Sequence, residues 1–149
     1  MKNSTVSETP NLFVDTWGWL ALEDATESAH DQVRLLREQY ARRGGLWVTT
    51  DYVLDETITR LFARRPFSEA AKFCDGIFRA RKLGLLTVER ISEERFRKAY
   101  RLRLRHKDKP RISFTDLTSF AVMQDLNIAY VLTRDAHFLQ TQLGFQALP

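Results

Sequence analysis

The sequence predicts a three-layer α/β/α domain with a central, mainly parallel sheet of four or five strands. Short apolar runs alternate along the chain with longer segments of helical periodicity, and this order favours parallel strands joined by helices. A chain of 149 residues is long enough to form one domain with its own core. Its apolar fraction of 44% and charged fraction of 28% are ordinary for a globular protein.

The first half of the chain contains two apolar runs, each followed by helical patterns. Residues 1–10 are polar and are expected to form a flexible tail, which leaves 11–149 for the domain. Thr50 can cap a helix that Pro66 then stops, because proline removes a helical hydrogen bond. The predicted elements are strand 11–15, helix 16–22, helix 27–43 ending at Gly44-Gly45, strand 46–49 and helix 50–65.

The second half continues the alternation. Ser68 is predicted to cap a helix that Gly84 closes, and Ser92 to begin a strongly basic helix. The inner side of the first helix is predicted to carry Phe73, Ile77 and Phe78, and the apolar members of the second, four residues apart, are Phe96, Tyr100 and Leu104. The predicted elements are helix 68–83, strand 85–88, helix 93–107, helix 113–126, strand 128–133, helix 136–143 and an edge strand at 145–147.

The composition excludes several classes of function. The single cysteine, Cys74, rules out an internal disulfide and a thiolate-rich metal site, and its apolar flanks predict a small buried hydrophobe. No apolar run approaches the roughly 20 residues of a membrane span, and residues 1–10 lack the apolar segment of a signal peptide. A cytoplasmic location without a membrane partner is therefore expected. Gly44-Gly45 lacks the lysine of a nucleotide-triphosphate loop.

The positive charge of the chain is concentrated in one segment. The formal net charge is +4, and nine basic residues with one acid lie between Arg95 and Arg111. Such blocks suit a polyanionic partner. A solvated helix face is the alternative, and the charge pattern alone leaves both readings open.

Four acidic residues stand where the predicted elements end or begin. Asp15 closes the first strand, Asp135 follows the fourth, Asp116 opens the helix at 113–126, and Glu56 lies in the helix after the second strand. Since the carboxyl ends of parallel strands meet at one edge of a sheet, these side chains are expected to gather there. Their mutual repulsion calls for a cation between them, and the pattern predicts a divalent metal.

Two of these acids also have a purely structural explanation. Asp15 can cap the helix at 16–22, and Asp116 completes a capping box with Ser113. An aspartate directly after the first strand, as Asp15 is, occurs in several folds that handle phosphate groups, so its position indicates a class of site but not a mechanism. A haloacid-dehalogenase-like phosphatase would need an aspartate where Trp17 stands, so that reading is weak.

Glu56 and His137 are the ambiguous candidates. Glu56 stands four residues before Arg60, a spacing typical of an exposed helical ion pair, and Asp55 is an equal candidate on periodicity alone. His137, two residues after Asp135, could be a metal ligand or general base, although histidines at helix starts more often cap or contact phosphate.

Taken together, these motifs resemble the PIN-domain ribonucleases, and within them the VapC-type toxins of bacterial toxin–antitoxin pairs. The matching motifs lie at 13–16, 49–56, 113–121 and 131–138, in the family's order and spacing. The resemblance covers about residues 11–148 and implies a PIN-like fold that hydrolyses RNA phosphodiester bonds with metal-activated water. The alternative is a catalytically inactive PIN-like module that binds RNA or protein.

The resemblance also assigns roles to residues. It places the acidic set on Asp15, Glu56, Asp116 and Asp135, and thereby selects Glu56 over Asp55. Asp15, Asp116 and Asp135 would hold Mg²⁺ or Mn²⁺, the ions that all-oxygen sites prefer. The hydroxyl groups near the metal would come from Thr16, Thr115 or Thr133, and the RNA backbone would lie on Arg97, Lys98, Arg101 and Arg105.

The same resemblance implies three partners: an RNA substrate, a cognate antitoxin protein and a second copy of the chain. Trp17, Trp19 and Phe67 could contribute to a dimer surface. For the two tryptophans, a place in the core is the favoured alternative.

Overall fold

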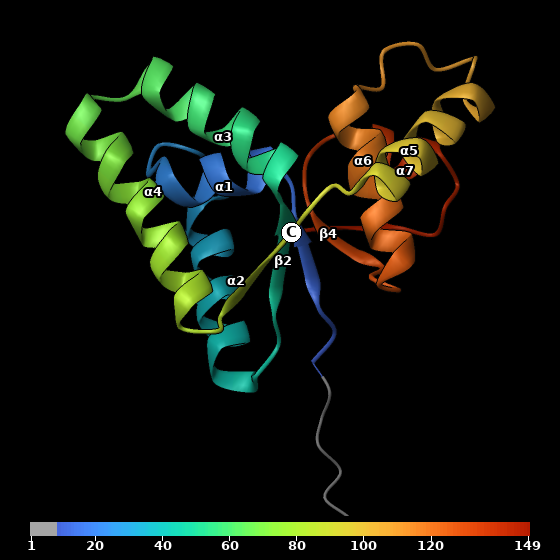
Figure 1. Ribbon diagram of the computed structural model, residues 1–149. Coiled ribbons are helices and arrows are strands. Elements are labelled where there is room, and N and C mark those ends of the chain that lie inside the picture. Colours follow the sequence, from blue (N-terminus) through green and yellow to red (C-terminus); the bar gives the residue numbers. More distant parts are fainter. Residues whose placement is uncertain (1–8) are drawn as a thin grey trace, which may run out of the picture.

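Five parallel strands form the centre of the protein, whose computed structural model describes residues 9–149 (Figure 1). The predicted flexible tail therefore lies almost entirely outside the described residues. The sheet order is β3-β2-β1-β4-β5. The strands are β1 (Leu12–Val14), β2 (Trp47–Thr50), β3 (Leu86–Glu89), β4 (Tyr130–Leu132) and β5 (Gln146–Leu148).

Helices cover both faces of this sheet. The helices are α1 (Thr16–Glu23), α2 (His30–Arg43), α3 (Asp51–Arg64), α4 (Phe67–Lys82), α5 (Glu93–Arg105), α6 (Phe114–Asp125) and α7 (His137–Gln140). Figure 1 shows α1 to α4 on one side of the strands and α5 to α7 on the other. The predicted three-layer fold with a parallel sheet is confirmed. No helix in residues 9–149 is long and apolar enough to cross a membrane, while the predicted cytoplasmic location stays a prediction.

The middle strand β1 is buried on both faces and lies at the point where the strand order reverses. Its three residues, Leu12–Val14, are fully buried, as expected of a strand covered on both faces. In register, Val14 pairs with Leu132 of β4, so these two strands end together. The sheet order reverses between them, because β2 and β3 lie on one side of β1 while β4 and β5 lie on the other. Such a switch point is where open α/β sheets build sites.

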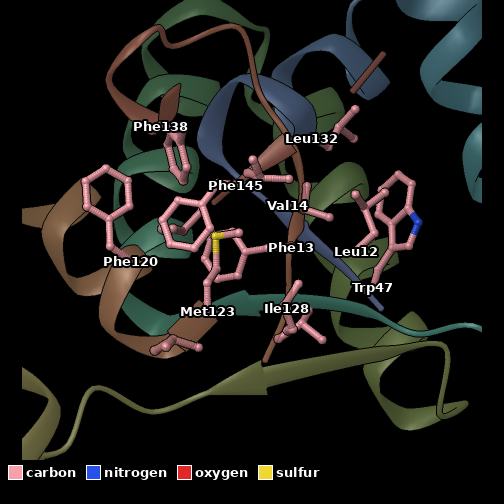
Figure 2. Packing of buried hydrophobic residues seen from close by; sticks show 14 of the residues in the cluster. Leu12, Phe13, Val14, Trp47, Phe120, Met123, Ile128, Leu132, Phe138 and Phe145 are labelled. Atoms are coloured by element: carbon pink, nitrogen blue, oxygen red, sulfur yellow. The ribbon is translucent and has the colours of Figure 1, made fainter. Parts of the chain in front are cut away.

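Aromatic packing fixes the helices against the sheet. On the side of α6, Phe120 packs edge-on against Phe138, with ring centroids 4.8 Å apart, and Phe145 lies 5.6 Å from Phe120 (Figure 2). On the other side, Trp19 packs edge-on against Trp47 at 5.7 Å. Trp19 is thus a core residue, in agreement with the alternative favoured from the sequence. Cys74 is buried as predicted.

Several predicted caps are present. The hydroxyl oxygens of Thr50, Ser92 and Ser113 accept hydrogen bonds from the backbone N–H three residues on, at the starts of α3, α5 and α6. Gly44, at the end of α2, has a φ of 74°, the left-handed conformation that glycine adopts without strain. Gly18 has a different role: an added Cβ would lie 2.9 Å from the Leu132 side chain, so its small size lets α1 approach β4.

Other boundaries differ from the prediction. Helix α2 begins at His30 rather than at residue 27, because Asp24 accepts hydrogen bonds from Thr26 and closes a turn first. Helix α4 begins at Phe67, with Pro66 at the N-cap, and Ser68 does not cap it. The last helix is shorter than predicted, since α7 ends at residue 140 rather than 143.

The apolar faces of α4 and α5 also differ from simple expectation. Phe78, predicted on the inner side of α4, is 50% exposed, while Ile77 and Cys74 are buried. On α5 the buried residues are Ala99 and Leu102. The apolar members spaced four apart, Phe96, Tyr100 and Leu104, are all exposed. The small residue Ala99 allows α5 to pack closely on the fold, which leaves the larger residues outside.

Candidate active site at the carboxyl edge of the sheet

Asp15 is buried at the end of β1 and is bonded across the sheet. Only 6% of the residue is exposed, and its Oδ2 accepts a hydrogen bond of 2.8 Å from the Thr133 hydroxyl. Burial raises the pKa of Asp15 to about 6, against the lowering effect of that hydrogen bond, and the charges of Asp135 and Glu56 raise it further. The side chain forms no capping bond to α1, so the structural explanation does not account for its position.

Asp116 occupies a similar environment in the first turn of α6. The residue is 7% exposed, and its backbone N–H donates to the Ser113 hydroxyl at 3.0 Å. Burial, followed by the charges of Asp15 and Asp135, raises the pKa of Asp116 to about 8. The capping bond uses the backbone and leaves the carboxyl group to face the other acids, so the two readings of this residue are compatible.

Asp135 and His137 complete this side of the cluster. The Asp135 N–H donates to the Thr133 hydroxyl at 3.0 Å, and the Asp135 Oδ1 accepts from the His137 N–H at 2.9 Å. The His137 Nδ1 lies 3.0 Å from the Asp135 Oδ1 and 3.7 Å from the Asp116 Oδ2. One ligand atom from each of the three residues lies within 4.8 Å of the others, an arrangement that could hold a metal ion.

Glu56 approaches the cluster from α3. Its Oε2 accepts a hydrogen bond of 3.0 Å from the Thr16 hydroxyl, and its Oε1 lies 2.6 Å from the Arg60 guanidinium. The helical ion pair expected from the spacing is therefore present, together with a contact to the residue after Asp15. Asp55 is exposed on the same helix. The geometry places Glu56, and not Asp55, beside the other acids.

The three threonines predicted near the metal have different roles. Thr16 and Thr133 donate to Glu56 and Asp15, and so hold these two carboxylates in position. The backbone carbonyl of Thr115 accepts hydrogen bonds from the hydroxyl groups of residues 118 and 119 within α6. These bonds stabilise the first turn of α6, and a role for the Thr115 hydroxyl at the site stays a prediction.

The electrostatics of the cluster fit a bound cation. Within residues 9–149, no lysine or arginine forms an ion pair with Asp15, Asp116 or Asp135. Buried carboxylates without a basic partner are unfavourable when ionised, which is why the pKa values of Asp15 and Asp116 are raised. A divalent ion would supply the missing charge, and carboxylate oxygens suit Mg²⁺ or Mn²⁺.

The basic helix α5 divides into two parts. Lys98 lies 2.8 Å from Asp125, at the C-terminal end of α6, while the Arg103 guanidinium donates to the Ile112 carbonyl just before α6 begins. The two helices are therefore antiparallel, and the C-terminal half of α5 lies toward Asp116. Lys98 is roughly 13 Å farther along α6, from nine residues at 1.5 Å each.

The four residues predicted to bind RNA are placed accordingly. Arg97 forms an exposed ion pair of 2.8 Å with Glu93, and Lys98 is held by Asp125. Arg101 and Arg105 are exposed on the half of α5 that lies toward Asp116. Nothing in their burial prevents these two arginines from meeting a polyanion.

An all-parallel three-layer fold with carboxylates gathered at its carboxyl edge defines the class, an α/β protein with an acidic site. The sequence profile of the PIN domain family matches residues 12–143. The chain therefore belongs to the PIN domain family, and the predicted resemblance is confirmed.

Relatives with stated activities lie within this family. The chain is 33% identical over 127 residues to the 23S rRNA-specific endonuclease VapC20 of Mycobacterium tuberculosis. The aligned region covers 85% of this chain and 91% of the relative. The crystal structure of that VapC20, described as a sarcin–ricin loop cleaving toxin, superposes with a TM-score of 0.73 at 28% identity, covering 89% of this chain and 95% of that one.

More distant structures share the fold alone. VapBC2 from Rickettsia felis, bound to a DNA fragment from its promoter, matches with a TM-score of 0.66 at 15% identity, over 92% of this chain and 96% of that one. DNA-bound VapBC from Salmonella typhimurium matches with a TM-score of 0.65 at 11% identity, over 94% and 98% of the two chains. The homology of this chain to VapC-type toxins rests on VapC20.

Proposed function

We propose that the chain is a divalent-metal-dependent endoribonuclease and the toxin of a type II toxin–antitoxin pair. The observation that carries the proposal is the cluster of buried carboxylates around Asp15 and Asp116, which have no lysine or arginine partner among residues 9–149. Its homologue VapC20, named an endonuclease specific for 23S rRNA, supports RNA as the substrate and 23S rRNA as the first candidate to test.

Each residue of the cluster has a proposed part in this activity. Asp116 and Asp135 lie close enough to share an ion with His137. Asp15, whose charge acts on Asp116, is the third carboxylate proposed to hold Mg²⁺ or Mn²⁺. When bound, such an ion lowers the pKa of a coordinated water and balances the charge that develops on the phosphate. Glu56 completes the acidic set and orients the attacking water, and the Thr16 hydroxyl fixes its carboxylate.

The RNA backbone is proposed to lie along α5. Of the predicted residues, Arg101 and Arg105 fit best, because both are exposed toward the Asp116 end of α6. Arg97 can join them, since an exposed helical ion pair is weak and exchanges readily with phosphate. Lys98 is the least suited, because Asp125 already neutralises it.

Two protein partners belong to the same proposal. The homologues include VapBC proteins solved with promoter DNA, which supports a separately encoded antitoxin for this chain. A homodimer is proposed from the family resemblance. Phe67, 78% exposed, remains available for such a surface, whereas Trp19 is buried in the core.

The test is cleavage of RNA by the purified chain. End-labelled 23S rRNA and a hairpin carrying its sarcin–ricin loop are incubated with Mg²⁺ or Mn²⁺, with EDTA as the metal-free control. We expect cleavage that EDTA stops and that Asp15→Asn reduces by at least about 100-fold, with an unchanged circular dichroism spectrum. Undiminished cleavage by Asp15→Asn would contradict the proposal. Absence of any cleavage, with RNA binding retained, would favour the inactive PIN-like module.

A further inference from the structure

A hollow outside the acidic cluster is lined mainly by residues of α1 and α3. It has a volume of about 300 Å³ and is lined by one aromatic ring, Trp17, with Leu20, Leu61, Arg60 and Arg64 among its other residues. This volume is at the lower end of the roughly 300–1,000 Å³ of small-molecule sites. The hollow therefore has room for a group the size of a nucleobase or nucleoside.

The hollow begins directly beside the acidic cluster. Trp17 is the second residue after Asp15, and Thr16 between them donates to Glu56. Glu56 in turn pairs with Arg60, which lines the hollow. The hollow is thus linked to the acidic cluster through the contacts of Glu56 with Thr16 and Arg60.

Arg134 brings a cation to the same tryptophan. Its guanidinium carbon lies 5.1 Å from the centre of the Trp17 ring. Arg134 is exposed and stands between Thr133, which bonds Asp15, and Asp135. No ion pair involves Arg134 in the part of the chain that the structure describes, so its donors are available to a phosphate.

The other charges around the hollow are largely neutralised within the protein. Arg65 is held by Glu23 and Asp24, at 2.9 and 3.3 Å. Arg64 and Glu27 also line the hollow; Arg64 is exposed, and the Glu27 carboxylate accepts a hydrogen bond from the Ser28 hydroxyl. The hollow is therefore not a general anion site. Its distinguishing feature is the aromatic ring of Trp17, together with the Arg134 guanidinium that lies over this ring.

We propose that this hollow is the subsite for the nucleotide next to the scissile phosphate, with the base stacked on Trp17 and the adjoining phosphate held by Arg134. Stacking of unpaired bases on aromatic rings, together with arginine contacts, is the usual way in which proteins hold single-stranded RNA. A base that is paired in an RNA duplex must first leave the duplex to enter the hollow. The subsite therefore selects RNA that is unpaired at the cut. This inference rests on the proposed ribonuclease function and deepens it.

The first test separates binding from chemistry in steady-state cleavage with Mn²⁺. Trp17→Leu is expected to raise KM by about 5- to 100-fold, the range for loss of one stacked base, with kcat changed much less. Trp17→Phe keeps a ring and should stay within about threefold of wild type. Arg134→Ala should raise KM and Arg134→Lys should recover part of the loss. Arg79→Ala, which removes an exposed arginine of α4, is the control and should leave both constants unchanged.

The second test leaves the protein unaltered. An RNA that lacks the base on one side of the mapped cut should lose about the same factor in kcat/KM with wild type as Trp17→Leu loses with intact RNA. The two losses should not multiply, because each removes the same stacking contact. An unchanged KM for Trp17→Leu would overturn the inference. An unchanged kcat/KM of the wild type with RNAs that lack the base on one side or the other of the cut would also overturn it, and this result does not depend on how well Trp17→Leu folds.

A third arm keeps this inference distinct from the proposed function. If the wild type cleaves no RNA with any divalent ion, the ribonuclease proposal fails, and the subsite is then tested by fluorescence anisotropy of labelled single-stranded RNA. Weaker RNA binding by Trp17→Leu, with Trp17→Phe close to wild type, would still support the subsite. Equal binding by Trp17→Leu and wild type would overturn it.

Discussion

The two ends of helix α6 carry aspartates in opposite electrostatic situations. Asp116 in the first turn is buried, has no lysine or arginine partner within residues 9–149, and has a pKa raised to about 8. Asp125 in the last turn lies 2.8 Å from Lys98 and 3.3 Å from Arg95, and these partners lower its pKa. An aspartate at one end of α6 thus forms ion pairs, whereas an aspartate at the other end belongs to an acidic cluster in which residues 9–149 provide no lysine or arginine partner.

This difference separates structural from functional acids. A charged side chain that only stabilises a fold is normally exposed or paired, as Asp125 is. Asp116 is neither, and it lies beside Asp15 and Asp135 at the carboxyl edge of the sheet. A cluster of this kind lowers the stability of the metal-free chain at neutral and alkaline pH, because its carboxylates repel one another when ionised. A bound divalent ion would balance this negative charge, which accounts for the presence of the cluster.

The largest expected effect contrasts the two aspartates in cleavage. Asp116→Asn should lower the rate of divalent-dependent RNA cleavage by at least about 100-fold, because it removes a proposed metal ligand. Asp125→Asn, the matched control on the same helix, should stay within about twofold of wild type. Rates of cleavage of an end-labelled RNA in saturating Mn²⁺ measure both. Equal losses in the two variants would remove the distinction between the ends of α6.

The second prediction concerns stability without metal. The folded pKa of Asp116 lies above its unfolded value, so its contribution to stability is fully present below about pH 4 and is lost as the pH rises through about 8. At pH 8.5 in EDTA, Asp116→Asn should therefore raise the free energy of unfolding by about 1–3 kcal/mol, at about 1.4 kcal/mol per pKa unit with partial screening. Urea unfolding at pH 5.5 and 8.5 measures the difference, which should shrink at the lower pH.

Asp125 provides the opposite sign in the same measurement. Its lowered pKa means that its stabilisation is present above about pH 4 and is lost as the pH falls through its folded pKa. Asp125→Asn should lower the stability by at most about 1 kcal/mol at pH 8.5, because a third of the side chain is exposed. Destabilisation of Asp116→Asn at pH 8.5, like that of Asp125→Asn, would contradict the account.

The third prediction extends the comparison to an acid at the site that does have an arginine partner. Glu56→Gln should reduce cleavage by about 10-fold, less than the loss of a buried metal ligand, because Glu56 acts at the margin and through Thr16. Asp55→Asn, on the exposed side of α3, should have no effect. Single-turnover rates at saturating enzyme measure both variants, and a larger loss in Asp55→Asn would reverse the assignment.

The smallest expected effect compares the two halves of α5. Arg101→Ala and Arg105→Ala should each raise KM for RNA by about three- to fivefold and reduce the slope of log KM against log salt by about one. Lys98→Ala, whose charge is already used by Asp125, should leave the salt slope unchanged. KM measured between 50 and 300 mM salt decides the point. A change of the salt slope in Lys98→Ala alone would place the RNA on the N-terminal half of α5 and contradict the proposal.

The sequence predicted the sheet well because its strands carry a local signal. The buried run Leu12–Val14 and the acid directly after it place Asp15 at a sheet edge without tertiary information. Asp135 follows β4 in the same way. The caps at Thr50 and Ser113 were predictable because capping uses residues within one turn.

Other features depended on tertiary packing and could not be predicted locally. Periodicity could not choose between Asp55 and Glu56, since the choice depends on which side of α3 faces Thr16, a contact 40 residues away in sequence. Ser68 was misread because Pro66, with its fixed φ, already starts the helix. His137 was left open because its proximity to Asp116 arises only when α7 folds against α6.

The central claim is that the acids around Asp116 form a divalent-metal site. The most direct test is calorimetric titration of the wild type with Mn²⁺ at pH 7 in buffers of different ionisation enthalpy. With the pKa of Asp116 near 8, metal binding should release about one proton per ion, because the ligands must be ionised. Asp125→Asn should release the same, and Asp116→Asn should not. No saturable Mn²⁺ binding, or binding without proton release in the wild type, would contradict the account.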